Sequence, residues 1–261
     1  MKTTQQIIYV FLSVIYFNKS IAQNSTYINA PQFWSEVDLS GKINQKLVYQ
    51  FDIQYARQGS SSEINLLRYN SQLTIRPWLH YYLKPTIRLS AFVGIWYNYG
   101  INDIGQREYP EWRVAQQATF YSPFEKFTLS NRFRLEERYI KDKQGEFETV
   151  LRSRYQLKCV APITKHTPET KGASYLVGFD EFFVNFGSKV TGYNLFDQNR
   201  IFIGYGYYLT NNLVIETGYF NQFQIESNGK AFDVNHVWQL TFYINNVFNK
   251  KVKNTTPDSG D

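Results

Sequence analysis

The sequence of 261 residues predicts an all-β protein, and three observations support this fold class. Aromatic residues make up 18% of the chain, and charged residues make up only 19%, below the usual value of about 25%. Apolar residues alternate with polar ones over long segments, which is the period of a strand with two chemically different faces. The chain has no run of about 20 mostly apolar residues, which excludes a bundle of membrane-spanning helices, and its aromatic content argues against disorder.

The N-terminal residues 1–22 have the three zones of a secretory signal peptide in the right order. Lys2 is the positive start, residues 7–17 are an apolar stretch too short to span a bilayer, and Ser20-Ile21-Ala22 is a cleavage site. No cysteine follows the stretch, which excludes a lipid anchor. We therefore expect a removed signal peptide and an exported mature chain that begins at Gln23.

The net charge and the cysteine content limit the possible partners and metal sites. The net charge of +6 falls to +4 without Lys2 and Lys19, since 28 basic residues become 26 against 22 acidic ones. The basic residues form no patch with stacked aromatics outside the strands, so we expect no nucleic-acid partner. Cys159 is the only cysteine, which excludes an intrachain disulfide and a zinc site built on cysteines.

Alternation with a period of two identifies the strands along the mature chain. In residues 47–55, Leu47, Phe51 and Tyr55 share one face and Asp52 lies on the other. Eight segments show this pattern clearly, and three weaker ones lie at residues 33–39, 64–76 and 175–186. The clear segments, in chain order, are 47–55, 83–97, 112–120, 127–139, 151–161, 201–209, 213–225 and 238–244.

The length of these segments and the spacing between them indicate a membrane barrel. Most are about 10 to 15 residues long, whereas an ordinary strand has about 5 to 6 and a tilted strand needs about 9 to 11 to cross a bilayer. Short turns alternate with longer polar loops, as in outer-membrane barrels. The short turns are 122–125 and 210–212, and the longer loops are 98–109, 141–146, 187–197 and 226–234.

Aromatic residues near the expected strand ends support the same interpretation, because Tyr and Trp form girdles at the membrane interface. These residues are Trp78, Trp96, Tyr97, Trp112 and Tyr139. We predict a closed antiparallel transmembrane up-and-down β-barrel of about 12 strands, with a range of 10 to 12, since bacterial barrels have an even number. A secreted soluble barrel or sandwich is the alternative.

The eleven segments leave the strand count open. A further short strand near residues 24–30 or in the connection 161–173 would make an even number. The other possibility is that residues 33–39 lie outside the wall.

Several segments resemble the uncharacterised exported proteins grouped as domain of unknown function 2490. They are RFRLEERY (132–139), LRSRYQLK (151–158), GFDEFFVNFG (178–187), FDQNRIFIGYGYYLTNNLVIETGYFNQ (196–222) and HVWQL (236–240). The resemblance covers nearly all of the mature chain and implies an outer-membrane β-barrel with no established ligand, reaction or catalytic residue. Many outer-membrane barrels end with their last strand, whereas this chain continues with the polar residues 249–261. We therefore expect a barrel at 23–248 and a tail at 249–261.

Charged residues on the polar faces of two adjacent strands predict an arginine-rich lumen. Within each strand these residues are spaced by even numbers of positions, so their side chains project to one side. They are Arg132, Arg134, Glu136, Arg138, Glu148, Arg152, Arg154 and Lys158. Expected counter-charges are Asp52, Glu216 and one of the adjacent Asp180 and Glu181, with Asp180 as the working choice. Two interpretations follow: a largely filled structural or binding barrel in which carboxylates neutralise the arginines, or a narrow channel for small, anionic solutes.

Enzymatic function has little support in the sequence. A lipid-modifying enzyme needs a nucleophile beside a base, and the sole candidate base is His236, with Ser227 or Asp233 in the preceding loop. We therefore predict no catalytic residues, no cofactor and no metal. The expected partners are the lipid bilayer of a Gram-negative-type outer membrane and the barrel-assembly machinery during insertion, and any small-molecule ligand stays open.

Overall fold

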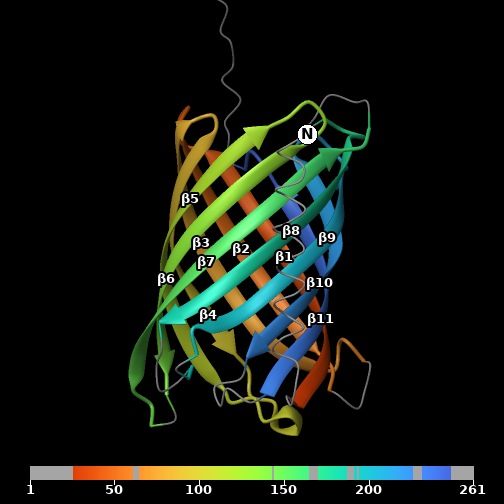
Figure 1. Ribbon diagram of the computed structural model, residues 1–261. Helices are drawn as coiled ribbons and strands as arrows, with labels where there is room; N and C mark the ends of the chain where they lie inside the picture. Colours follow the sequence, from red (N-terminus) through yellow and green to blue (C-terminus); the bar gives the residue numbers. More distant parts are fainter. Residues whose placement is uncertain are drawn as a thin grey trace, which may run out of the picture.

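The computed structural model is a closed barrel of eleven strands (Figure 1). It describes residues 26–60, 65–142, 144–164, 170–186, 191–192, 194–225 and 231–247, with the side chains of 26–30 left out. The predicted signal peptide (1–22) and polar tail (249–261) lie outside these residues. Among the residues described, no helix is long and apolar enough to cross a bilayer.

Each of the eleven segments expected from the sequence corresponds to one strand. The strands are β1 (Thr26–Lys42), β2 (Leu47–Gln58), β3 (Tyr69–Lys84), β4 (Ile87–Asn98), β5 (Tyr109–Pro123), β6 (Thr128–Lys141), β7 (Phe147–Pro162), β8 (Ser174–Phe186), β9 (Phe196–Tyr208), β10 (Leu213–Ile225) and β11 (Ala231–Ile244). A 3₁₀ turn, η1 (Asn102–Ile104), lies between β4 and β5. The prediction of a closed all-β barrel of 10 to 12 strands is confirmed.

The barrel closes by a parallel pairing of β1 with β11. All other neighbouring strands are antiparallel. Up-and-down strands alternate in direction, so the first and last of an odd number point the same way and can pair only in parallel. The purely antiparallel, even-numbered wall expected from the sequence is therefore replaced by ten antiparallel contacts and one parallel seam. Residues 26–30, where a separate strand was considered, extend β1.

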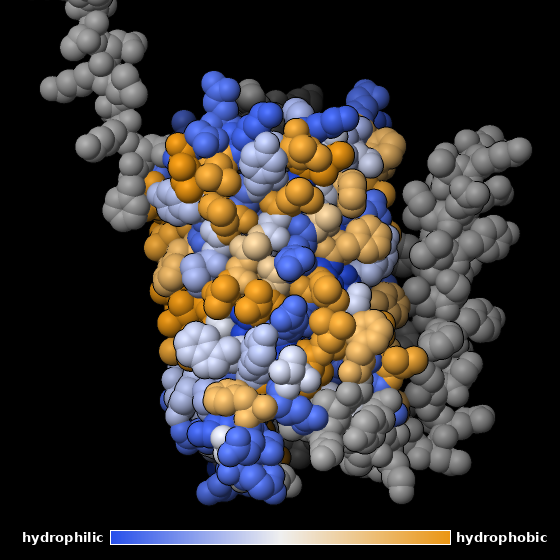
Figure 2. All heavy atoms as spheres, turned by 90° about the vertical axis from the view of Figure 1, so that its left-hand side faces the viewer, coloured by the Kyte–Doolittle hydropathy of each residue, from blue (hydrophilic) through white to orange (hydrophobic). Residues whose placement is uncertain are grey.

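The alternating side chains give the barrel two different surfaces. On β4, Leu89 and Val93 point outward, whereas Ser90 and Phe92 are buried inside. The outward residues include large apolar side chains on every strand from β2 to β11 except β10, with Ile203 66% exposed. Figure 2 shows apolar side chains mainly around the middle of the barrel and hydrophilic ones at its two ends.

Two apolar clusters lie within the otherwise polar interior. Trp78, Phe92, Trp96 and Ala115 form the first. Trp78 and Trp96, expected from the sequence in an outer aromatic girdle, are thus 7% and 5% exposed inside the barrel. Both tryptophans are an even number of positions away from inward-pointing residues of the same strand. This spacing, rather than their position near strand ends, decides which way their side chains point.

The second apolar cluster joins β8 to β11 and is formed by Val177, Phe202, Phe220 and Val237. Gly204 makes room for it, because a Cβ at this position would lie 2.6 Å from Phe202 Cζ. The glycine in this strand therefore permits close packing, as glycines within strands often do.

Candidate functional site in the charged interior

The interior holds a polar cavity of about 1090 Å³ to which all eleven strands contribute side chains. Six of the eight residues of the predicted basic face line it: Arg132, Arg134, Arg138, Arg152, Arg154 and Lys158. Glu136 is fully buried among them. Glu148 lies at the beginning of β7 and does not line the cavity.

Glu136 is the centre of the largest ion-pair network. Its carboxylate accepts hydrogen bonds from Arg134 Nη1 at 3.2 Å, Arg152 Nη2 at 2.6 Å and Arg154 Nη1 at 2.6 Å. The β6–β7 register places Arg152 directly opposite Glu136 and Arg154 opposite Arg134. A buried carboxylate is stable only when it is paired and hydrogen-bonded, so these arginines and Glu136 depend on one another.

Two further carboxylates extend this network. Glu181 Oε1 accepts from Arg132 Nη2 at 2.5 Å and from Arg154 Nε at 2.9 Å, so Arg154 bridges Glu181 and Glu136. Asp197 Oδ2 accepts from Arg152 Nη1 at 3.1 Å. Four consecutive strands, β6 to β9, are therefore linked along the inner wall by ion pairs.

Of the adjacent pair Asp180 and Glu181, Glu181 is the one that lines the cavity. Asp180 accepts a hydrogen bond from Asn199 Nδ2 at 2.6 Å. Neighbouring residues of a strand face opposite sides, so only one of the two could face the arginines. Asp180, the predicted counter-charge, therefore faces away from the arginines, and Glu181 faces them instead.

A second network surrounds Glu111, which is only 1% exposed. Arg113 and Arg138 each donate two hydrogen bonds to this carboxylate, at 2.6 and 3.0 Å and at 2.5 and 3.1 Å. Such two-point contacts fix the planar guanidinium groups in place. Glu111 was not among the predicted lumen residues because the segment was expected to begin at Trp112, although Glu111 lies two residues before Arg113 and so on the same face of β5.

Aromatic rings face several of the arginines. Arg113 lies 3.9 Å from the Trp96 ring centroid, and Arg154 lies 4.2 Å from that of Phe183. Cations at these distances are attracted by the ring quadrupole. The apolar residues inside the barrel therefore stabilise its charges as well as filling space.

The two other predicted counter-charges lie on the opposite side of the barrel from the Glu136 network. Asp52 accepts from Trp78 Nε1 at 2.7 Å and lies 3.4 Å from Arg76 Nε. Glu216 accepts from the hydroxyls of Tyr175 at 2.7 Å and Tyr243 at 3.3 Å. Neither touches the basic face on β6 and β7, so the interior has a basic side and an acidic side.

One protein-family model matches this barrel. The model of the family described as "Protein of unknown function (DUF2490)" matches residues 31–233, more than half of the chain. The chain belongs to the DUF2490 family. No curated protein and no solved structure matches it.

Two histidines of the DUF2490 barrel lie beside hydroxyl groups: His80 Nδ1 is 2.8 Å from Ser90 Oγ, and His236 contacts a tyrosine. His236 points outward, where its Nδ1 lies 2.6 Å from the Tyr219 hydroxyl, whereas Asp233 lines the interior cavity. Ser227 and His166 lie outside the described part of the chain. His80 is buried within β3, between Ser90 and Gln50.

Proposed function

We propose that this DUF2490 protein is an outer-membrane β-barrel, exported through a cleaved signal peptide and inserted by the barrel-assembly machinery. The observation that carries the proposal is the inverted distribution of side chains, with large apolar residues outside and buried ion pairs inside. Soluble monomers rarely expose contiguous apolar patches larger than a few hundred Å². In lipid the same outward residues are in their preferred solvent, and a closed barrel leaves no backbone edge unpaired.

The interior supports a structural or binding barrel rather than a wide pore. The carboxylates of Glu111, Glu136 and Glu181 hold the arginines of β5 to β7 by buried ion pairs along the inner wall. The remaining cavity of about 1090 Å³ is comparable to a small-molecule site. The interior is therefore better suited to binding a small polar ligand than to the free passage of large solutes.

Cell fractionation tests the membrane assignment. We expect the protein in the outer-membrane fraction, with a band that migrates differently on a gel before and after heating. Recovery in the soluble periplasmic fraction, with no heat-modifiable band, would contradict the proposal.

A narrow channel for small anions is the second candidate, and four cations of the cavity favour it. Among the described residues, Arg88, Arg107, Lys158 and Arg200 line the cavity without forming an ion pair with a carboxylate. Rings of Arg and Lys can select anions. The unpaired cations would give the lumen a preference for negative charge.

Reconstitution in planar bilayers separates the two candidates. A channel is expected to give stable conductance whose anion preference falls when Lys158 and Arg200, which line the cavity without a carboxylate partner, are changed to Gln. A barrel that is silent in the bilayer, although folded by its heat-modifiable band, supports the structural or binding function and contradicts the channel.

A further inference from the structure

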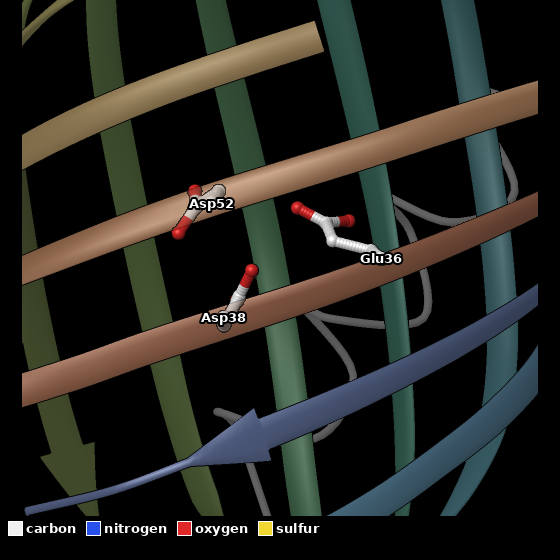
Figure 3. A group of neighbouring side chains, drawn as sticks. All are labelled: Glu36, Asp38 and Asp52. Atoms are coloured by element: carbon white, nitrogen blue, oxygen red, sulfur yellow. The ribbon is translucent and has the colours of Figure 1, made fainter. Parts of the chain in front are cut away.

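Three carboxylates meet on the acidic side of the interior (Figure 3). Glu36 and Asp38 lie on β1 and Asp52 on β2, where Asp52 pairs directly with Asp38. One oxygen of each lies within 4.8 Å of one oxygen of each of the others. All three are buried, with exposures of 8%, 8% and 3%, and all line the cavity.

The positive charge around this acidic cluster is insufficient to neutralise it. Arg76 pairs with Glu36 and lies 3.4 Å from Asp52 Oδ2. Its guanidinium is the one cation that contacts the cluster among the residues described. Three carboxylates therefore face one guanidinium, and carboxylates at this spacing repel one another strongly when they are ionised.

Neutral donors satisfy most of the carboxylate oxygens, with one exception. Gln50 Nε2 donates to Asp52 Oδ1 at 2.6 Å and to Asp38 Oδ2 at 3.2 Å, and Gln54 Nε2 donates to Glu36 Oε2 at 3.1 Å. Asp38 Oδ1 is buried without any hydrogen-bond partner. Figure 3 shows the Asp38 side chain directed toward the space between Asp52 and Glu36. A buried, unpartnered carboxylate oxygen is costly unless a ligand satisfies it.

We propose that Glu36, Asp38 and Asp52 form a binding site for a divalent cation, with Ca²⁺ as the best fit. Calcium takes six to eight oxygen ligands at about 2.3 to 2.6 Å, and carboxylate oxygens this close together can share one such ion. Magnesium usually keeps several waters and is bound by only one or two carboxylates, so three protein carboxylates at one ion favour Ca²⁺. The bound ion would supply the missing positive charge and a partner for Asp38 Oδ1, and it would enter from the cavity.

The site is independent of the membrane proposal, because it depends only on side chains inside the barrel. Asp38 is the residue to change, since no Lys or Arg of the described residues contacts it. Asp38→Asn therefore removes a ligand charge without leaving a guanidinium unpaired. Glu216→Gln is the matched control, because Glu216 lines the same cavity but accepts hydrogen bonds from Tyr175 and Tyr243.

Calcium titration of the purified, chelator-treated protein by calorimetry tests the site. We expect one saturable site, a loss of affinity of about tenfold or more in Asp38→Asn and unchanged affinity in Glu216→Gln. Calcium is expected to raise the Tm of the unchanged protein and of Glu216→Gln but not that of Asp38→Asn. With chelator, Asp38→Asn should be at least as stable as the unchanged protein, because it relieves repulsion.

A second measurement uses the unchanged protein, so its result does not depend on whether a variant folds. Tb³⁺ substitutes for Ca²⁺, and its luminescence should be sensitised by Trp78, whose Nε1 lies 2.7 Å from Asp52 Oδ2. We expect Ca²⁺ to displace this signal at lower concentrations than Mg²⁺. The proposal is overturned if no saturable binding occurs up to about 10 mM Ca²⁺, above the range of weak calcium modules. Equal Ca²⁺ affinity in Asp38→Asn and the unchanged protein would overturn it as well.

Discussion

At the scale of single residues, the interior is organised by a few fully buried carboxylates. Glu136 is 0% exposed and contacts three arginines, and Glu111 is 1% exposed and contacts two. Removing one partner of a buried ion pair leaves an uncompensated charge, and this is much more costly than the pair itself is stabilising. The carboxylates are therefore the sensitive positions of the network.

Changing Glu136 to Gln should destabilise the barrel by about 3 to 5 kcal/mol, because Arg134, Arg152 and Arg154 lose their common acceptor. Glu137→Gln is the control, since Glu137 is the next residue on β6 and lies on the exposed outer face. Denaturant unfolding followed by circular dichroism gives the comparison. Equal stability of the two variants would show that the central network does not stabilise the fold.

At the scale of elements, β3 shows how a sequence signal for a strand end can mislead. The predicted segment ends at Arg76, before Pro77, but the strand continues to Lys84. Proline removes one ladder donor and is tolerated where that hydrogen bond is dispensable. The β3–β4 register is the same on either side of Pro77, since Ile75 pairs with Ile95 and Trp78 with Phe92.

Gly204→Ala should destabilise the contact between β9 and β10 by about 1 to 3 kcal/mol, because its Cβ would lie 2.6 Å from Phe202 Cζ and 2.9 Å from Thr217 O. Gly178→Ala on the neighbouring strand β8 is the control. Its Cβ would meet only Phe202 O, at 3.5 Å, which is an ordinary contact. Thermal unfolding should separate the two variants, and an equal Tm would contradict the packing role of Gly204.

At the scale of the whole molecule, the parallel seam decides how the barrel closes. Ser35 on β1 pairs with Leu240 on β11, and both side chains lie on the outer face. A double variant with Ser35→Cys and Leu240→Cys, made with Cys159→Ser, should form a disulfide upon oxidation, because adjacent strands are about 4.8 Å apart. Mobility on a non-reducing gel detects it.

The control for the seam pairs Ser35→Cys with Thr241→Cys in the same background. Thr241 is 1% exposed and points inward, so these two thiols lie on opposite faces. Efficient crosslinking in this pair, or none in the Ser35 and Leu240 pair, would rule out the observed register.

The proposed membrane location predicts different costs for charge at two positions of the outer surface. Ile203→Arg, midway along β9, should lower folding into lipid vesicles, since Arg at the bilayer midplane costs about 2 to 4 kcal/mol. Leu209→Arg, in the turn at the end of the barrel, should cost much less. The yield of the heat-modifiable band measures both, and equal yields would argue against a bilayer around the middle of the barrel.

Alternation in the sequence located eleven strand segments, most of their inward and outward positions, and the basic face of β6 and β7, but it left the strand count open. These features depend on alternation within a segment, which is local. The parallel seam, the pairing of Glu181 rather than Asp180 with the arginines, the central position of Glu136 and the contact of Glu36 and Asp38 with Asp52 emerge only in the closed barrel. Those depend on strand count and on register between strands, and residues such as Glu136 and Glu181 lie far apart in the chain. Parity predicts which way a side chain points, but closure of the barrel selects its partner.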